Sequence, residues 1–351
     1  TRVGMKGLGS VFVDALSSVK DSTIVFEPSL FSFEDRIVLA PMQGLTSLYF
    51  RKAFELCFPS CVDYAISPFI SVTAGENDET SRKFRDVRIA DNMSSMRVVP
   101  QLIGSEPNGI AKYANLLYDM GYQNVNLNLA CPSKPVLRHN RGAALLRDVK
   151  GLECFLKAVC GALKGGLSLK IRLGCESKLD LAELVRCLND LNLDSVVVHP
   201  RLAVEKYEGS CDYEAFDYLC SNLRHRLVYN GDINTPKDFF EIKNRFPQIR
   251  DFMIGRGILR DPLLPAKIRG LNFDAGVLEW FFSKLGEFYL NDFLEVGDLD
   301  SLSSDKRPRI EKALSDKLKE LSSYMFPDLF SQIVACKNAN EINAIVSRRF
   351  R

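Results

Sequence analysis

The chain has 351 residues, 46% of them hydrophobic and 26% charged, values that are ordinary for a globular protein whose fold rests on buried apolar area. Its length suits one large domain and one small one, or two domains of medium size. The formal net charge of +2 is too small to predict a nucleic-acid partner, so any basic surface must be local.

Ten scattered cysteines without a C-x-x-C pair, and only three histidines, predict free thiols in a reducing compartment and no metal site. The N-terminus lacks the apolar region and small-residue cleavage site of a secretory signal. No uncharged apolar run approaches about 18 residues, which excludes a membrane span. We therefore expect a cytoplasmic protein that is a monomer.

From residue 36 onward, short runs rich in β-branched residues alternate with amphipathic stretches. The predicted strands are 36–40, 63–67, 97–102, 124–129, 167–173, 195–199, 226–230 and 251–255. Each is apolar on both faces and bounded by turn residues, as is typical of strands buried in a parallel sheet.

Helical spacing follows in 109–121, 180–192 and 235–246, where Asp180 and Thr235 are candidate N-caps. A doubly wound open sheet has the same alternation. Eight regular units in about 220 residues favour closure into a (β/α)₈ TIM barrel.

Beyond residue 262 no strand is predicted, and helical periodicity covers 277–295 and 311–326. We therefore expect an extension over 1–35, a barrel over 36–265 and an all-helical C-terminal domain over 266–351.

Polar groups and tight turns gather at the carboxyl ends of the predicted strands, where TIM barrels carry their active sites. They are Pro41, Met42, Gln43, Ser67, Gln101, Asn128, Cys131, Lys170, Arg172, His199, Arg201, Asn230, Gly231, Asp232, Gly255 and Arg256. So many polar strand ends are hard to explain by packing.

Two of these ends, NGDI after the seventh strand and IGRG after the eighth, predict a phosphate site, because glycines let backbone N–H groups approach an anion. The alternative is that these glycines make tight turns only. In LSLKIRL, alternation directs Lys170 toward the barrel axis, where it needs an anionic partner such as a reduced flavin or, alternatively, a carboxylate within the barrel.

Cys131 differs from the other cysteines because it follows an Asn-bearing strand and precedes Pro132, on a loop at the barrel mouth. A thiol there could act as nucleophile, base or acid, and its ordinary pKa suits proton donation. Inert packing is the default for a lone cysteine. For His199 the sequence allows two roles, contact with a ligand or a purely structural one. Basic runs at 134–150 and 81–88 could meet phosphates, although charge runs are usually solvated faces.

These residues resemble a known family. The segments LAPMQGLT, PQLIGS, NLNLACPSKPVLRHNRGAALLRD, LKIRLG, VVHPRLAVEKYEGSCDY, YNGDI and MIGRGILRDP occur in the order and spacing of the tRNA-dihydrouridine synthases. The similarity covers about 36–265, and the helical tail resembles that family's RNA-binding domain.

The resemblance implies bound FMN, NADPH as electron donor and tRNA as substrate. Matched by position, the flavin-binding residues would be Pro41, Met42, Gln43, Gln101, Lys170 and His199, and the ribityl-phosphate residues Asn230, Gly231, Asp232, Gly255 and Arg256. Asn128 and Arg201 would contact the uracil. Hydride from flavin N5 would add at C6, and Cys131 would protonate C5 as general acid.

Two other functions stay open. One is an FMN barrel that acts on a free pyrimidine, like dihydroorotate dehydrogenase, which would have no use for the helical tail. The other is a non-catalytic RNA-binding relative, which departures from the family pattern at Gln43, Ala130 and Pro200 permit.

Overall fold

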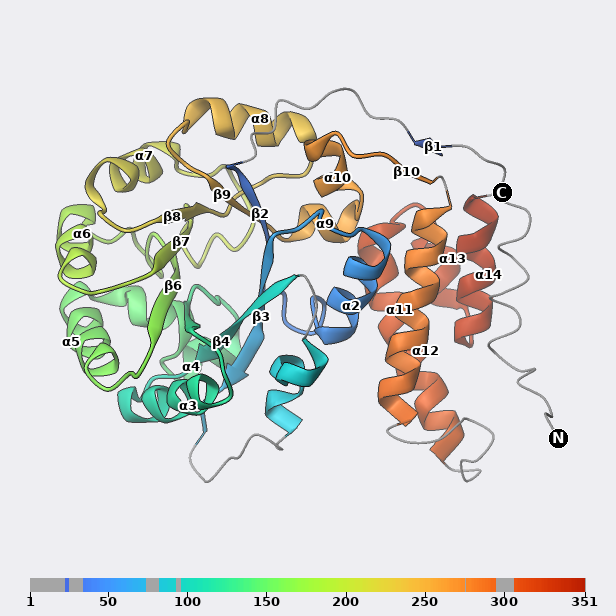
Figure 1. Ribbon diagram of the computed structural model, residues 1–351, viewed down its shortest axis with the longest axis horizontal. Helices are drawn as coiled ribbons and strands as arrows, with labels where there is room; N and C mark the ends of the chain where they lie inside the picture. The colour runs from blue at the N-terminus through green and yellow to red at the C-terminus, as the bar shows by residue number, and fades with distance from the viewer. Residues whose placement is uncertain are drawn as a thin grey trace. The chain divides into compact units, whose positions relative to one another are not determined.

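The computed structural model describes residues 23–24, 34–73, 82–92, 96–274, 276–294 and 306–350. Eight parallel strands close into a barrel in chain order, β2 pairing with β3 on one side and with β9 on the other. Figure 1 shows helices surrounding these strands. The predicted (β/α)₈ barrel is confirmed.

The barrel strands are β2 (Arg36–Leu39), β3 (Tyr64–Ser71), β4 (Arg97–Ile103), β5 (Asn124–Leu129), β6 (Gly166–Arg172), β7 (Ser195–His199), β8 (Leu227–Tyr229) and β9 (Asp251–Ile254). Between and after them lie α3 (Pro107–Asp119), α4 (Lys134–Arg138), α5 (Val149–Cys160), α6 (Leu181–Asn189), α7 (Tyr213–Asn222), α8 (Pro236–Arg245), α9 (Arg256–Arg260) and α10 (Leu264–Arg269), with short 3₁₀ segments η2 (Arg82–Val87), η3 (Ile89–Asp91) and η4 (Gly142–Arg147).

The helix starts follow the local chemistry of the sequence. Asp180 accepts a hydrogen bond from the Glu183 amide at the start of α6. Thr235 and Asp238 form a reciprocal capping box on α8, with Pro236 in the first turn. These contacts satisfy amides that the helix itself leaves without partners.

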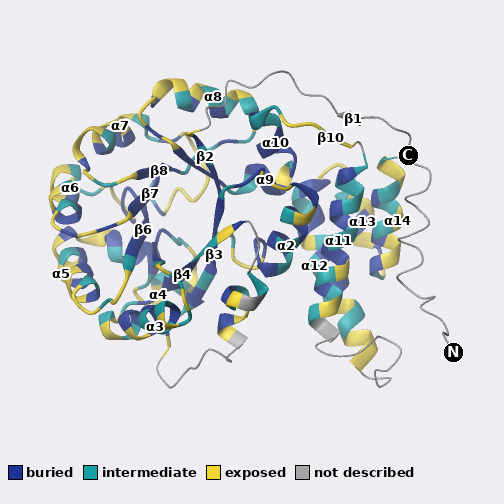
Figure 2. Cartoon of the chain, viewed as in Figure 1, coloured by how far each residue is buried: buried dark blue, intermediate teal, exposed yellow. Residues whose placement is uncertain are grey.

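Apolar strand faces form the barrel core, and the outer surfaces of the helices face solvent (Figure 2). One buried cluster joins side chains of five strands with the residue that follows β2. It consists of Val38, Ala40, Tyr64, Ile66, Val197, Val228 and Met253.

Two sequence expectations were wrong in detail. The strand expected to end at Ser67 continues to Ser71, because the pairing of β3 with β4 resumes after a register shift between Ile66 and Phe69. A strand also occurs beyond residue 262: β10 (Phe273–Asp274) pairs antiparallel with β1 (Thr23–Ile24). Two-residue strands are too short to show any periodicity.

The chain divides into two compact units, and the barrel strands belong to the one that spans 32–48 and 60–257. The other unit contains α2 (Leu48–Cys57) from Tyr49 onward, together with the C-terminal helices α11 (Val277–Leu294), α12 (Lys306–Met325), α13 (Phe330–Ala335) and α14 (Ala339–Arg349).

An aromatic cluster holds α2 in this helical unit. Phe50, Phe54 and Phe58 place their ring centroids 5.6, 6.0 and 5.2 Å from that of Phe281 on α11. The four rings are almost fully buried, so this contact contributes both apolar area and edge-to-face geometry. Within the residues that the structure describes, no helix has the length and apolar character needed to cross a bilayer.

Asp251 anchors the amino-terminal end of the barrel. Its carboxylate is fully buried, lies 2.8 Å from Arg36 Nη2 and accepts a hydrogen bond from Tyr64 Oη.

Replacing Asp251 with Ala leaves a guanidinium without its partner, and we expect the free energy of unfolding in urea to fall by about 3 kcal/mol. Asp119→Ala, which breaks an exposed pair with Lys164, is the control and should cost far less. Equal losses would contradict this assignment.

Candidate functional site

The pairing register brings polar side chains to one side of neighbouring strands. Asn128 of β5 is level with Lys170 of β6, and Arg172 is level with His199 of β7. Residues level with each other in a parallel sheet share a face, and these four are at least nine-tenths buried. Lys170 is also level with Val197 of the buried cluster, which fits the inward direction predicted from alternation.

Lys170 is a buried cation without a carboxylate partner among the described residues. Burial, together with the neighbouring Arg172, lowers the pKa of Lys170 to about 7. Among the described residues Lys170 has no ion pair, so the alternative of a Lys–carboxylate pair within the barrel is not found there. A group of this kind is stabilised when an anion binds beside it.

Arg172 links the strand to the loop that carries Cys131. Its Nε donates to the carbonyl of Ala130 at 3.0 Å, and its Nη1 donates to the carbonyl of Leu202 at 2.8 Å. Burial lowers the pKa of Arg172 to about 10, which still leaves it charged at neutral pH. The guanidinium thus ties the ends of β5 and β7 together.

The Cys131 loop is held from both sides. Asn128 Oδ1 accepts hydrogen bonds from the amides of Ala130 and Cys131, at 3.0 and 2.9 Å. The Cys131 carbonyl accepts from the Ala143 amide. Gly142 has a φ of +57° at this point, and a Cβ there would lie 3.0 Å from the Cys131 carbonyl. The thiol itself is partly exposed, 3.5 Å from Ser133 Oγ.

A second group of charges lies at the ends of β7, β8 and β9. Asp232 bridges two guanidiniums, forming ion pairs with Arg201 Nη2 and, at 3.0 Å, with Arg256 Nη2. Arg201 also donates to His199 Nε2 at 3.3 Å. Because a guanidinium only donates, this nitrogen accepts and the His199 proton is on Nδ1.

His199 is neutral in this setting. Burial, followed by the charges of Arg172, Lys170, Arg201 and Arg256, holds its pKa well below the ordinary value. The ring lies 6.1 Å from that of Tyr207, and Arg256 lies 4.1 Å above the same tyrosine. Tyr207 therefore joins the histidine to the arginine that follows β9.

The glycines of NGDI and IGRG lie in crowded places. A Cβ on Gly231 would lie 2.1 Å from Tyr229 Oη, and one on Gly255 would lie 3.3 Å from Met42 Sδ. Asn230 Nδ2 donates to the Met253 carbonyl across the strands. The close approach of Gly255 to Met42 brings the end of β9 beside the turn that follows β2.

That turn contains Pro41 and Met42, both half-buried, and Gln43, which is exposed. Thr46 closes it by accepting from the Met42 amide and donating to the Ala40 carbonyl, both at 2.9 Å. Thr46 was not predicted from the sequence, because its place in LAPMQGLT offered no signal beyond a possible turn.

The site residues therefore form two groups on one barrel. The first contains Gln101, Asn128, Cys131, Lys170 and Arg172, and the second contains His199, Arg201, Asp232 and Arg256 with Tyr207. Tyr207, Asn126 and Ser168 were missed as site residues. Alternation offered a signal for the last two, since they lie two residues before Asn128 and Lys170 and so share their faces of the strands. Together the groups hold three guanidiniums and the amine of Lys170 against one carboxylate, which suits an anionic ligand.

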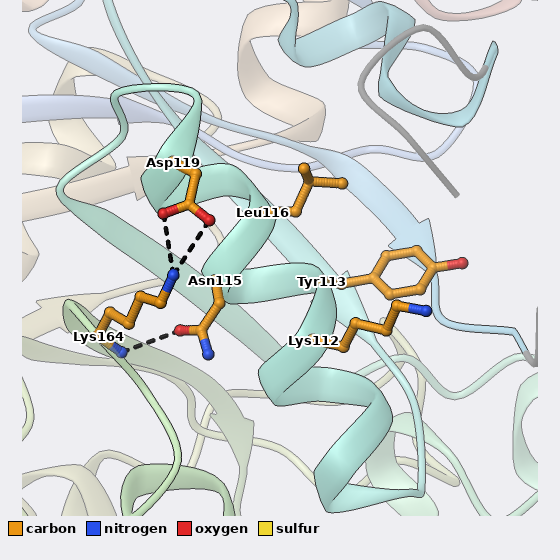
Figure 3. Close-up of a pocket in the computed structure, with 6 residues that line it drawn as sticks. All are labelled: Lys112, Tyr113, Asn115, Leu116, Asp119 and Lys164. Carbon is orange, nitrogen blue, oxygen red and sulfur yellow. Dashed lines mark hydrogen bonds and ion pairs between the residues drawn. The ribbon is translucent and has the colours of Figure 1, made fainter. Parts of the chain in front are cut away.

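A separate pocket lies on the outside of the barrel (Figure 3). It is lined by α3 and by Lys164, whose Nζ contacts both Asp119 carboxylate oxygens at 3.1 Å and whose amide donates to Asn115. Lys164 precedes β6, so this end of the pocket is at the opposite end of the strands from Cys131. Among the described residues, no group of three His, Cys, Asp or Glu side chains is placed to hold a metal ion.

Comparison with known proteins decides the family. The sequence profile described as "Dihydrouridine synthase (Dus)" matches residues 38–276, more than half of the chain. The chain belongs to the dihydrouridine synthase family.

Curated relatives of this family member carry matching names. A probable tRNA-dihydrouridine synthase of Helicobacter pylori is 30% identical over 265 residues, covering 72% of this chain and 77% of the relative. The tRNA-dihydrouridine(16) synthase of Neisseria meningitidis is 26% identical over 89% of this chain and 94% of its own length.

Among solved structures, morphinone reductase in complex with tetrahydroNAD matches with a TM-score of 0.50 and 11% identity. The match covers 69% of this chain and 91% of that chain. It shows a shared fold.

Lys170 gives a test of the site's electrostatics. Lys170→Met removes a buried charge, and we expect it to raise the free energy of unfolding of the ligand-free protein by roughly 1–3 kcal/mol at pH 6. The folded-state pKa of about 7 lies below that of the unfolded chain. Wild-type stability therefore rises with pH above 7, and the difference between the two proteins narrows by pH 9. Urea titrations at both pH values measure this; a less stable variant at pH 6 would contradict it.

Proposed function

We propose that this protein reduces the C5=C6 bond of uridines in tRNA to give dihydrouridine, with FMN as bound cofactor and NADPH as electron donor. The barrel of 36–265 is the proposed catalytic domain, and the helices of 266–351 the proposed RNA-binding domain. One observation carries the proposal. Lys170, a buried amine on β6, lies on the strand next to β5, which is followed by the partly exposed thiol of Cys131.

The residues fit a flavin. Lys170 has no carboxylate partner among the described residues and would neutralise an anionic ring edge. Gln101 accepts a hydrogen bond from Asn128, the register partner of Lys170. Pro41, Met42, Gln43 and His199 are the proposed surroundings of the ring. When bound, the flavin would supply the hydride that adds at C6 of the base.

The proposed phosphate site is at the ends of β8 and β9. Arg256 would supply the positive charge, and Asp232 holds its guanidinium in place. A side chain at position 231 would collide with the Tyr229 hydroxyl, and one at position 255 would press against Ala40 and Met42. Asn230 fixes the spacing of the two strands through the Met253 carbonyl.

The proton would come from Cys131. Addition of hydride at C6 leaves a negative charge over C5 and the C4 carbonyl, and a proton at C5 completes the reduction. The Cys131 amide is anchored on Asn128, so the thiol is held on a loop whose backbone is fixed. The target base would have to leave its stack to reach such a mouth.

Two residues are proposed to contact the uracil. Asn128 lies two residues before Ala130, in the strand that ends at the thiol loop. Arg201 is almost fully buried and already donates four hydrogen bonds, to the Glu208 and Gly209 carbonyls, His199 and Asp232. One N–H of Arg201 remains for the base. The main effect of Arg201 in this structure is to hold Asp232.

Replacement of Cys131 with Ala tests the proposal. We expect flavin content and NADPH oxidation to remain close to wild type, while dihydrouridine formation in unmodified tRNA falls by about a hundredfold or more. Cys154→Ala, at an exposed thiol of α5, is the matched control and should leave all three unchanged.

Full uridine reduction by the Cys131 variant would remove this residue from the role of acid. A wild-type protein that reduces a free pyrimidine and leaves tRNA untouched would replace the proposed substrate. A purified protein without a flavin spectrum would contradict the proposal as a whole.

A further inference from the structure

A line of hydrogen-bonded side chains begins at the exposed Asp194, at the amino-terminal ends of the strands, and runs through the barrel interior to the Cys131 loop. In order from the mouth it contains Asn128, Gln101, Asn126, Ser168, Asn124 and Asp194. Its middle members Gln101 and Asn126 are fully buried, and Ser168 is almost fully buried.

The upper end of the line fixes its direction. The amides of Ala130 and Cys131 can only donate, so the atom of Asn128 that faces both of them, at 3.0 and 2.9 Å, must be Oδ1. This choice leaves Asn128 Nδ2 facing Gln101.

Every orientation below follows from that one. Asn128 Nδ2 donates to Gln101 Oε1 at 2.8 Å, so Gln101 Nε2 faces Asn126 and donates to its Oδ1 at 2.7 Å. Asn126 Nδ2 then donates to Ser168 Oγ at 3.0 Å. Reversal of any one amide would put two donors or two acceptors face to face, which is costly in a buried site.

The lower end enforces the same direction. Ser168 Oγ, having accepted from Asn126, donates to Asn124 Oδ1 at 2.9 Å, and Asn124 Nδ2 donates to the carboxylate of Asp194. An ionised carboxylate only accepts. The line therefore begins at groups that only donate and ends at one that only accepts.

The hydrogen-bonding capacity of Asn128 is almost used up by this arrangement. Both lone pairs of Oδ1 are taken by backbone amides, and one hydrogen of Nδ2 is taken by Gln101. One amide hydrogen is left, so the residue can act toward a substrate as a donor to a carbonyl oxygen and in no other way.

We propose that Asn126 and Ser168 are positioning residues for the reduction: through Gln101 they hold the Asn128 side chain in place against the amides of Ala130 and Cys131, and so hold the Cys131 loop. This inference rests on the proposed function. Neither residue is placed in contact with the base or the cofactor; they act through Gln101.

Asn126 offers a pair of variants that separate hydrogen bonding from size. Asn126→Leu removes the acceptor for Gln101. Asn126→Asp keeps that acceptor, and its other oxygen can accept a hydrogen bond from the Ser168 hydroxyl. For the flavin-loaded enzyme acting on tRNA, we expect Leu to lower kcat per bound flavin by about tenfold or more with KM for tRNA within about twofold, and Asp to stay within about threefold of wild type.

Ser168 provides a second test in a milder variant. Ser195 is its register partner on β7, is equally buried, and has no side-chain hydrogen bond to the described residues. We expect Ser168→Ala to lower kcat per flavin by about threefold or more, and Ser195→Ala to leave it unchanged. The inference would be overturned if Asn126→Leu kept the wild-type kcat, or if Asn126→Leu and Asn126→Asp lost kcat equally. Equal losses of kcat in Ser168→Ala and Ser195→Ala would also overturn it.

Alkylation separates this inference from the proposed function, because it needs no turnover. With iodoacetamide and peptide mass spectrometry, Asn126→Leu should change the rate of Cys131 modification by about threefold or more, with Cys154 in the same molecule as internal reference. An unchanged Cys131 rate would overturn the positioning role. A wild-type enzyme inactive on tRNA, with the rate still altered in the variant, would remove only the proposed function.

Discussion

The lateral register of β4, β5, β6 and β7 is the constraint on which the site depends. Gln101 is level with Asn126, Asn126 with Ser168, and Asn128 with Lys170. A shift of one residue in any of these pairs would turn a polar side chain toward the helices and break the hydrogen-bonded line. The thiol, the buried cation and the amide that lies between them therefore owe their positions to strand pairing rather than to the loops alone.

This arrangement places costly groups inside the barrel. Lys170 and Arg172 are buried cations with pKa values lowered by burial, and His199 remains neutral beside them. The buried apolar cluster that includes Val197 and Val228 lies in the same barrel, and Val197 is level with Lys170. Burial of these apolar side chains offsets the destabilisation that the buried cations cause, as is common at functional sites.

Much of the fold could be predicted from the sequence, because eight apolar runs and the caps at Asp180 and Thr235 are local signals. The end of β3 could not, since its pairing resumes after a bulge that depends on β4. The two-residue pairing of β1 with β10 joins segments about 250 residues apart and leaves no pattern.

The candidate site was predicted as a set of residues, and their roles remain predictions. Alternation could show that Asn126 and Ser168 share a face with Asn128 and Lys170, yet it could not show that they touch. That contact depends on the register between strands, and the direction of each amide depends on the backbone donors beside Cys131. Tyr207 lies on an irregular loop, where no periodicity indicates which side chain turns toward Arg256.

The central claim is that this chain reduces uridines in RNA, and its most direct test is a map of dihydrouridine in RNA from cells with and without the gene. We expect one or a few tRNA positions to lose the modification when the gene is absent and to regain it when the wild-type gene is restored. An unchanged map, with flavin-loaded protein present in the parent cells, would contradict it.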